Sequence, residues 1–373
     1  MTDVLILDAV RTPVGRADGV LAALQVEELI SSLINALLER NSLQAQSINE
    51  VIIGNAAGPG GNPARVGLLH AGLPMQVPGL TVDRQCGSGL EAINLGARLI
   101  QSGAAQCVLA GGVESVSTSP KRPRSRFSPE HIGDPDMGIA AENVAKRYQI
   151  SRQRQDQLAF RSHQNAVASS RAGDFADEII PQQTLEHRVL EDECPRDDCS
   201  LERLARLPPV FLKGGSVTAG NTCPINDGAA LVLLMSAELA QESAMTAVSA
   251  NRRRQPLYFI DAETTGVDPN YLGIGPVPAV QALLARQQLH VDDLGRIEFN
   301  EAFAAQVLAS TDALGLPLDK VNVGGGALAL GHPYGASGAI LVTRLFHGLA
   351  DGATGLATLG AAGGLGTATL FRR

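Results

Sequence analysis

The feature that most constrains this chain of 373 residues is an internal duplication, because its second half repeats short motifs of its first half in the same order. Ile-Leu-Asp-Ala at residues 6–9 and Ser-Gly at residues 88–89 have counterparts at residues 259–262 and 337–338, about 250 residues further along. Each half also ends in a cluster of glycines. This order predicts two similar halves that face each other, with functional residues where their loops meet.

Both halves alternate apolar runs with segments of helical periodicity. Residues 4–7, 50–55 and 107–110 predict buried strands, and residues 26–38 predict an amphipathic helix. The apolar content of 45% is enough for a sizeable core. The alternation predicts an α/β protein built from parallel βαβ units.

A change of composition interrupts the first half. Pro, Arg, Asp, Glu and Gln dominate after residue 117, with helical spacing near residues 140–148 and 151–172. We interpret this part as an inserted loop domain. The expected division is an N-terminal half at residues 1–117 and 226–246, the loop domain at residues 118–225, and a C-terminal half at residues 247–373.

The charge and the cysteines limit the range of functions and compartments. The net charge of -8 argues against a general role on nucleic acids or membrane surfaces. Five cysteines, an odd number, indicate a reducing compartment rather than a disulfide framework. The start of the chain shows no targeting signal, and no apolar run is long enough to span a bilayer. We therefore expect a cytoplasmic protein.

Cys86 is the first candidate for chemistry. It is followed by Gly-Ser-Gly and then by an apolar run, residues 90–100, with helical spacing. This places the sulfur near a helix N-terminus, where free N–H groups and the helix dipole lower the pKa of a thiol. The alternative interpretation is a buried structural cysteine.

His332 and Asn300 are candidates to assist such a nucleophile. His332 stands in a glycine-bounded turn that corresponds to the Cys86 turn of the other half. A neutral imidazole there can accept the thiol proton or hydrogen-bond a thioester oxygen, although a satisfied turn histidine is the alternative. Asn300 follows a predicted strand and could hold an oxyanion or an ordered water, or simply cap the strand.

Together these stretches resemble the thiolase family over nearly the whole chain. Cys86 matches the acyl-accepting nucleophile in Cys-Gly-Ser-Gly-Leu, His332 the histidine of Gly-His-Pro, and Asn300 the asparagine of Asn-Glu-Ala-Phe. The resemblance implies α-β-α-β-α layers from two duplicated halves and a loop domain that binds coenzyme A. It also implies a homodimer or a homotetramer.

The resemblance further implies a two-step acyl transfer through an acyl-Cys86 intermediate. Coenzyme A and acyl-CoA would be the substrates, without any further cofactor or metal. The backbone N–H groups of Cys86 and Ala362 would form an oxyanion hole. The substrate contacts implied by the resemblance are Arg196, Ala219, Cys223, Leu272 and Phe303.

One departure from the family pattern bears directly on the reaction. Thiolases usually carry a second cysteine, as general acid and base for carbon–carbon chemistry, where this chain has Gly360. No other cysteine of the sequence is expected to replace it. We therefore expect 3-ketoacyl-CoA thiolysis or condensation with reduced efficiency. The alternatives are an acyltransferase or thioesterase without carbon–carbon chemistry and, less favoured, a non-catalytic partner subunit.

Overall fold

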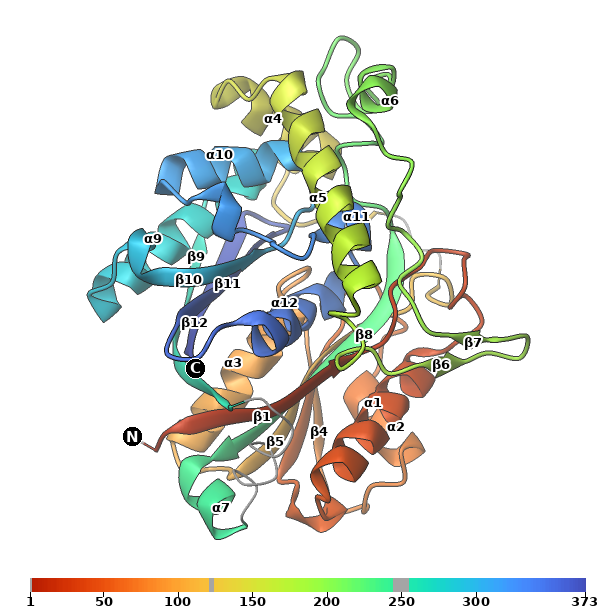
Figure 1. Ribbon diagram of the computed structural model, residues 1–373, viewed down its shortest axis with the longest axis vertical. Coiled ribbons are helices and arrows are strands. Elements are labelled where there is room, and N and C mark those ends of the chain that lie inside the picture. The colour runs from red at the N-terminus through yellow and green to blue at the C-terminus, as the bar shows by residue number, and fades with distance from the viewer. Residues whose placement is uncertain (1, 121–123, 244–254) are drawn as a thin grey trace.

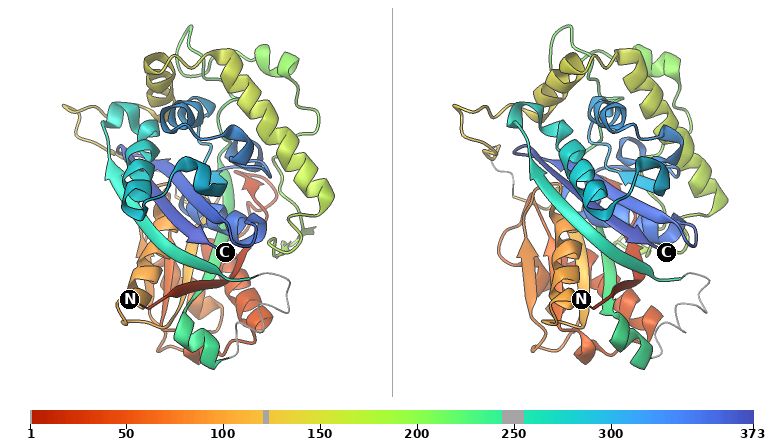
Figure 2. Two further views of the ribbon diagram at one scale, coloured as in Figure 1. Left: turned by 60° about the vertical axis from the view of Figure 1, so that its left-hand side comes forward. Right: turned by 90° about the vertical axis from the view of Figure 1, so that its left-hand side faces the viewer.

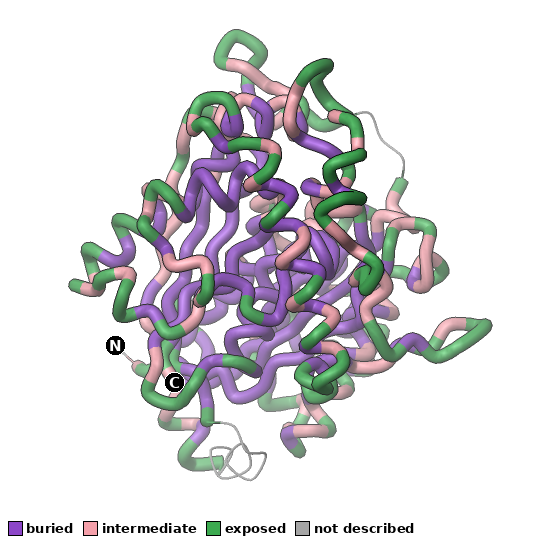
Figure 3. Tube along the Cα trace, turned by 45° about the horizontal axis from the view of Figure 1, so that its top comes forward, coloured by how far each residue is buried: buried purple, intermediate pink, exposed green. Residues whose placement is uncertain are grey.

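The computed structural model describes residues 2–120, 124–243 and 255–373, and it confirms the predicted α/β class (Figure 1). Helices and sheets alternate in five layers, with two long helices in the middle layer. The buried part of the chain runs through these inner layers, and the exposed segments lie at the periphery (Figure 3). The layered α-β-α-β-α arrangement is therefore the one that the family resemblance implied, and its two halves face each other as the duplication predicted.

The N-terminal half contributes one sheet and three main helices. Its main strands are β1 (Val4–Arg11), β3 (Glu50–Gly54), β4 (Gly79–Val82), β5 (Cys107–Glu114) and β8 (Asn226–Ser236), and its helices are α1 (Val26–Asn41), α2 (Pro63–His70) and α3 (Ser88–Gln101). In α1 the apolar residues Leu29, Leu33 and Leu37 recur at helical spacing and are buried against the sheet. α1 and α2 cover the outer face of this sheet and α3 covers the inner face.

The C-terminal half repeats this plan. Its strands are β9 (Leu257–Gly266), β10 (Leu294–Phe299), β11 (Thr354–Ala361) and β12 (Leu365–Arg372), and its helices are α9 (Pro276–Gln287), α10 (Ala304–Leu314) and α12 (Tyr334–Gly348). α9 and α10 pack on the outer face, and α12 packs on the inner face beside α3. The two inner helices thus form the middle layer.

The two sheets join at one edge. β9 pairs with β1 at Leu5 and Ile6, so the strands form one ten-stranded sheet in the order β10-β11-β12-β9-β1-β8-β5-β3-β4, with β2 (Gly15–Arg16) beside β8. Figure 2 shows β9 running down to β1 at this junction.

The expectation of parallel βαβ units holds for only part of this sheet. β3 is parallel to β4 and β5, and β10 is parallel to β11. β8, β9 and β12 are antiparallel to their neighbours. The reason is visible at β12, which follows β11 after a turn of three residues and must run in the opposite direction.

The repeated Ser-Gly motif marks the place where α3 and α12 cross. A Cβ on Gly89 would lie 2.6 Å from the carbonyl oxygen of Gly335, and a Cβ on Gly338 would lie 2.4 Å from the backbone nitrogen of Leu90. Only glycine allows the two backbones to approach so closely. The duplication therefore places matching contact points on the two helices whose N-terminal ends carry the candidate site.

The inserted segment lies against the C-terminal half (Figure 1). Its helices are α4 (Met137–Arg147), α5 (Arg152–Ala172) and α6 (Leu201–Ala205), and its short hairpin is β6 (Gln182–Gln183) with β7 (Arg188–Val189). Ser151 caps α5 by accepting a hydrogen bond from the Arg154 N–H. The predicted division into three domains stays a prediction, and its boundary at residue 246 falls outside the described residues.

The remaining elements are short. They are η1 (Ala45–Ser47), α7 (Ala237–Glu242), η2 (Pro269–Ile274), η3 (Val291–Asp293), η4 (Leu318–Lys320) and α11 (Ala327–Leu330). Among the described residues, no helix combines the length and apolar character that crossing a membrane requires.

Candidate active site

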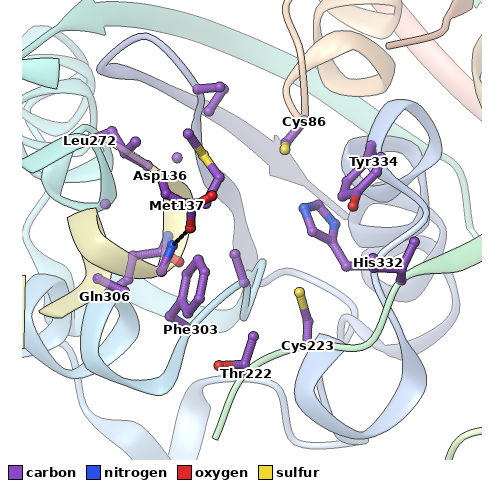
Figure 4. A pocket seen from close by; sticks show the side chains of 18 of the residues that line it. Cys86, Asp136, Met137, Thr222, Cys223, Leu272, Phe303, Gln306, His332 and Tyr334 are labelled. Atoms are coloured by element: carbon purple, nitrogen blue, oxygen red, sulfur yellow. Dashed lines mark hydrogen bonds between the residues drawn. The ribbon is translucent and has the colours of Figure 1, made fainter. Parts of the chain in front are cut away.

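Cys86 opens into a cavity of about 260 Å³ at the N-terminal end of α3 (Figure 4). The turn before the helix is held by Ser88, whose Oγ accepts from the Arg84 N–H at 2.8 Å and donates to the Gln85 carbonyl at 2.6 Å. Gln85 has a positive φ of 53°, which turns the chain sharply at the residue before the cysteine. The turn fixes the sulfur at the base of the cavity.

The electrostatics of Cys86 differ from the expectation. Burial of the sulfur, together with the charge of Glu114, raises the pKa of Cys86 to about 12 despite the opposing backbone N–H groups of Cys86 and Ala362. The low pKa predicted from the helix N-terminus is therefore wrong, because desolvation of the anion outweighs the dipole. A thiol of this kind needs a base at the moment of reaction.

His332 lies on the same cavity, and a neutral imidazole can accept a proton. Its Nδ1 lies 2.6 Å from the Ser337 hydroxyl, and its Nε2 lies 3.4 Å from Nδ2 of Asn300. These contacts fit the tautomer with the proton on Nδ1 and the lone pair on Nε2. Burial lowers the pKa of His332 to about 4, so the ring is neutral at pH 7.

Asn300 lies behind His332 rather than on the Cys86 cavity. It follows β10, its backbone N–H donates to the Thr358 carbonyl at 3.1 Å, and it is almost fully buried. It lines a small neighbouring cavity together with Gly331 and Ser337. In this structure its side chain can orient the imidazole.

The turn between β11 and β12 forms another wall of the cavity. Ala362 directs its backbone N–H toward the Cys86 sulfur, beside the N–H of Cys86 itself, as an oxyanion hole would require. Gly360 also lines this wall. A Cβ added to Gly360 would lie 3.3 Å from Nε2 of Gln306 and 3.4 Å from the carbonyl oxygen of Leu272, so a side chain would project toward these two groups.

The residues expected to contact substrate fall into two adjoining cavities. Cys223, Leu272 and Phe303 line the cavity of Cys86. Arg196 and Ala219 line a larger cavity of about 620 Å³. Thr222 and Pro224 border both cavities, which therefore adjoin.

The structure corrects one expectation about the cysteines. No other cysteine was expected to reach the chemistry, but the sulfur of Cys223, one of the implied substrate contacts, points into the Cys86 cavity from the opposite side (Figure 4). Burial and the proximity of Cys86 raise the pKa of this thiol. The inserted segment therefore brings a second thiol into the site.

Sequence reasoning missed Glu114, which lies beneath the site at the end of β5. Its carboxylate accepts hydrogen bonds from the N–H groups of Ala56, Ala57 and Gly335 at 3.0–3.1 Å. Burial raises its pKa to about 7. The signal that could have found it is an acidic residue at the end of an otherwise apolar strand.

Sequence reasoning also missed Gln306 and Tyr334, which line the cavity. The ring of Tyr334 packs edge-on against His332, with centroids 5.3 Å apart. Neither residue belongs to a motif that indicates chemistry by itself. Across the described residues, no three His, Cys, Asp or Glu side chains gather as metal ligands.

A duplicated fold with a cysteine and a neutral histidine at the ends of its two central helices defines a class of acyl-transferring enzymes, and comparison with known proteins agrees. The thiolase N-terminal domain family matches residues 4–238, and the thiolase C-terminal domain family matches residues 255–373. The chain therefore belongs to the thiolase family and is an acyltransferase.

Individual relatives resemble it over their full length. "Putative acetyl-CoA C-acetyltransferase VraB" of Staphylococcus epidermidis is 44% identical over 388 residues, which cover 100% of this chain and 99% of that protein. The protein of the same name from Staphylococcus aureus is 44% identical over 389 residues, covering 100% of both. The crystal structure of the Bacillus anthracis acetyl-CoA acetyltransferase superposes with a TM-score of 0.91 at 36% identity, covering 100% of this chain and 98% of that one.

Proposed function

We propose that this protein transfers acyl groups from acyl-CoA through a thioester on Cys86. The observation that carries the proposal is the meeting of the Cys86 sulfur, the neutral His332 and the N–H groups of Cys86 and Ala362 in one cavity. These are a nucleophile, a base and an oxyanion site. The names of the relatives favour acetyl or similarly short acyl groups.

In the first half-reaction Nε2 of His332 gives up its long contact of 3.4 Å with Nδ2 of Asn300 and accepts the proton of the Cys86 thiol, while the sulfur attacks the thioester carbonyl. The tetrahedral oxyanion accepts hydrogen bonds from the N–H groups of Cys86 and Ala362. Collapse of this intermediate breaks the bond to the sulfur of coenzyme A, and His332 returns the proton to that leaving thiolate. Because His332 is neutral at pH 7, it can perform both transfers without a prior change of charge.

In the second half-reaction an acceptor takes the acyl group. The thiol of another coenzyme A molecule is activated by His332 in the same way, so exchange of acyl groups between thiols requires no further residue. Forming or breaking a carbon–carbon bond requires a second acid and base, which Gly360 cannot supply. The Cys223 thiol is a poor substitute, because burial raises its pKa and disfavours the thiolate that a base requires. We infer that 3-ketoacyl-CoA thiolysis and condensation are slowed by about 10²- to 10⁴-fold relative to a complete site, which leaves acyl transfer or hydrolysis as alternative outcomes.

The larger cavity suits the nucleotide part of coenzyme A. Three arginines border it, namely Arg16, Arg196 and Arg203, although each is ion-paired with Glu193 or Asp198. Its shared border at Thr222 and Pro224 would lead a pantetheine arm toward Cys86. A homodimer or homotetramer stays a prediction.

Exchange of labelled coenzyme A into acetyl-CoA or butyryl-CoA tests this proposal. The reaction depends on an acyl-enzyme but on no carbon–carbon chemistry. We expect exchange in the unmodified protein and at least a 10³-fold loss in Cys86→Ala, on the order of the loss of a covalent nucleophile. Binding of coenzyme A without exchange would contradict the proposal and favour the non-catalytic alternative.

A further inference from the structure

Gln306 carries an unpaired buried carboxamide. The residue is 2% exposed, and both Nε2 and Oε1 are buried without a hydrogen-bond partner in the part of the chain that the structure describes. Buried polar side chains are nearly always hydrogen-bonded, and leaving one unpaired costs free energy. Such a group on the wall of a ligand cavity points to a partner that the ligand supplies.

The carboxamide faces the space above Gly360. Gln306 lies in the first turn of α10, and its stem packs on Gly273, where a Cβ would come within 2.8 Å of the Gln306 Cγ. Its Nε2 lies 3.3 Å from the position that a Cβ of residue 360 would occupy. The absence of a side chain at Gly360 therefore leaves room beside the amide.

The surroundings of the amide restrict the chemistry of its partner. Met137, Leu272 and Phe303 make the neighbouring wall apolar, and Asp136 adds a carboxylate to the same cavity (Figure 4). A carboxylate ligand would be desolvated next to Asp136, which is unfavourable. A neutral partner is therefore favoured.

Both amide atoms are unpaired, so the best partner is a group that donates and accepts. A ketone oxygen can satisfy Nε2 but leaves Oε1 unpaired. A hydroxyl group satisfies both, because its proton can bond to Oε1 while its lone pairs accept from Nε2. A hydroxyl is also small enough for the space that a glycine leaves.

We propose that Gln306 and the space above Gly360 form a subsite for a hydroxyl group on the acyl chain of the substrate. This inference rests on the proposed acyl transfer through Cys86 and names the class of acyl group, a hydroxyacyl thioester. Gly360 then accounts both for the loss of the second cysteine and for the space in which a hydroxyl group is recognised.

The subsite can be tested by measuring how fast different acyl-CoA thioesters acylate Cys86. The probes are 3-hydroxybutyryl-CoA, 4-hydroxybutyryl-CoA and butyryl-CoA, with the acyl-enzyme quantified by peptide mass spectrometry. We expect at least one hydroxyacyl-CoA to react about tenfold faster than butyryl-CoA, as one satisfied hydrogen-bonding group would give. The readout is the acylation rate with a hydroxyacyl-CoA divided by the rate with butyryl-CoA, both measured on the same protein. A general loss of activity in a variant lowers both rates and leaves this ratio unchanged.

The informative variant is Gln306→Met, which keeps the length of the side chain and removes the amide. We expect its rate ratio to fall to about one. Thr222→Val is the matched comparison, because Thr222 carries another unpaired buried polar atom on the same cavity and is the rival site for the hydroxyl group. Its ratio should remain that of the unmodified protein.

A melting measurement without ligand provides a second readout. Gln306→Met should raise the melting temperature, since it removes unpaired buried atoms. Gln155→Met should lower it, because the Gln155 amide donates to the Ile150 carbonyl and to Ser216 at 3.2 and 2.9 Å.

Two results would overturn the subsite. These are the absence of any preference for a hydroxyacyl group in the unmodified protein and a preference that survives in Gln306→Met. Acylation by none of the three thioesters would instead overturn the proposed function, and the subsite with it.

Discussion

At the scale of single residues, burial has a larger effect on the pKa values of the site than nearby charges have. Cys86 and His332 are both shifted toward their neutral forms, with pKa values of about 12 and about 4. A thiol and a neutral imidazole therefore coexist at pH 7, and a charged thiolate–imidazolium pair is disfavoured. Proton transfer between them accompanies the attack on the substrate.

The first prediction concerns the alkylation of Cys86 by iodoacetamide. Only the thiolate reacts, and the pKa lies far above neutral pH, so the rate should rise about tenfold per pH unit from pH 7 through pH 9. Peptide mass spectrometry separates the Cys86 peptide from those of the other four cysteines, which are buried or half-buried. A rate that levels off below pH 8 would contradict the raised pKa.

The sequence could indicate which residues meet in the cavity, but it could not indicate their pKa values. Cys86 and His332 could be placed together because they stand in turns at matching places of the two halves, whereas Ala362 followed from the family resemblance. The pKa of Cys86 could not, since it depends on the depth of burial and on Glu114, which comes from another strand. The position of Cys223 depends on the path of the inserted segment, which no local pattern specifies.

At the scale of elements, the site depends on the contact between α3 and α12. The N-terminal turns of these helices carry Cys86 and His332, so their crossing sets the distance between nucleophile and base. Helix α1 and strands β1, β3 and β5 could be predicted from apolar runs and their periodicity. Strand direction could not, because it depends on which strands become neighbours after the chain has folded.

The second prediction concerns Gly338→Ala. The new Cβ would lie 2.4 Å from the backbone nitrogen of Leu90, so the helices must move apart. We expect a loss of about 1–3 kcal/mol in the free energy of unfolding, as for other overpacked contacts. Gly266→Ala is the control, because the nearest atom to its Cβ would be 4.0 Å away. Equal stability of the two variants in urea would contradict the account of the crossing.

At the scale of the whole molecule, a buried ionic cluster links the two halves and the inserted segment. Glu178, from the inserted segment, pairs with Arg11 of β1 and with Arg344 of α12. Burial alone would raise the pKa of Glu178, but the charges of Arg344 and Arg11 outweigh it and lower the pKa to about 2. The cluster therefore stabilises the fold only while Glu178 is ionised.

The third prediction concerns Glu178→Gln. It removes the countercharge that Glu178 gives to the buried Arg344 and leaves Arg11 with Asp192 alone, so we expect a loss of about 3–5 kcal/mol in the free energy of unfolding at pH 7. Because the folded pKa lies below the unfolded value of 4.5, the contribution of Glu178 is present above that pH and is lost as the pH falls toward 2. The exposed pair of Asp312 with Arg154 gives the control, Asp312→Asn, with an expected change below about 1 kcal/mol. Comparable losses in the two variants, measured by urea unfolding, would contradict this role.

The most direct test of the whole account is the mass of the protein after a brief reaction with acetoacetyl-CoA. We predict an acyl adduct on the peptide of Cys86, present in Cys223→Ala and absent in Cys86→Ala. An acetoacetyl adduct is expected, since Gly360 slows carbon–carbon cleavage, whereas an acetyl adduct would mean that cleavage survives. An adduct that persists in Cys86→Ala, or that forms on Cys223, would contradict the assignment of the nucleophile.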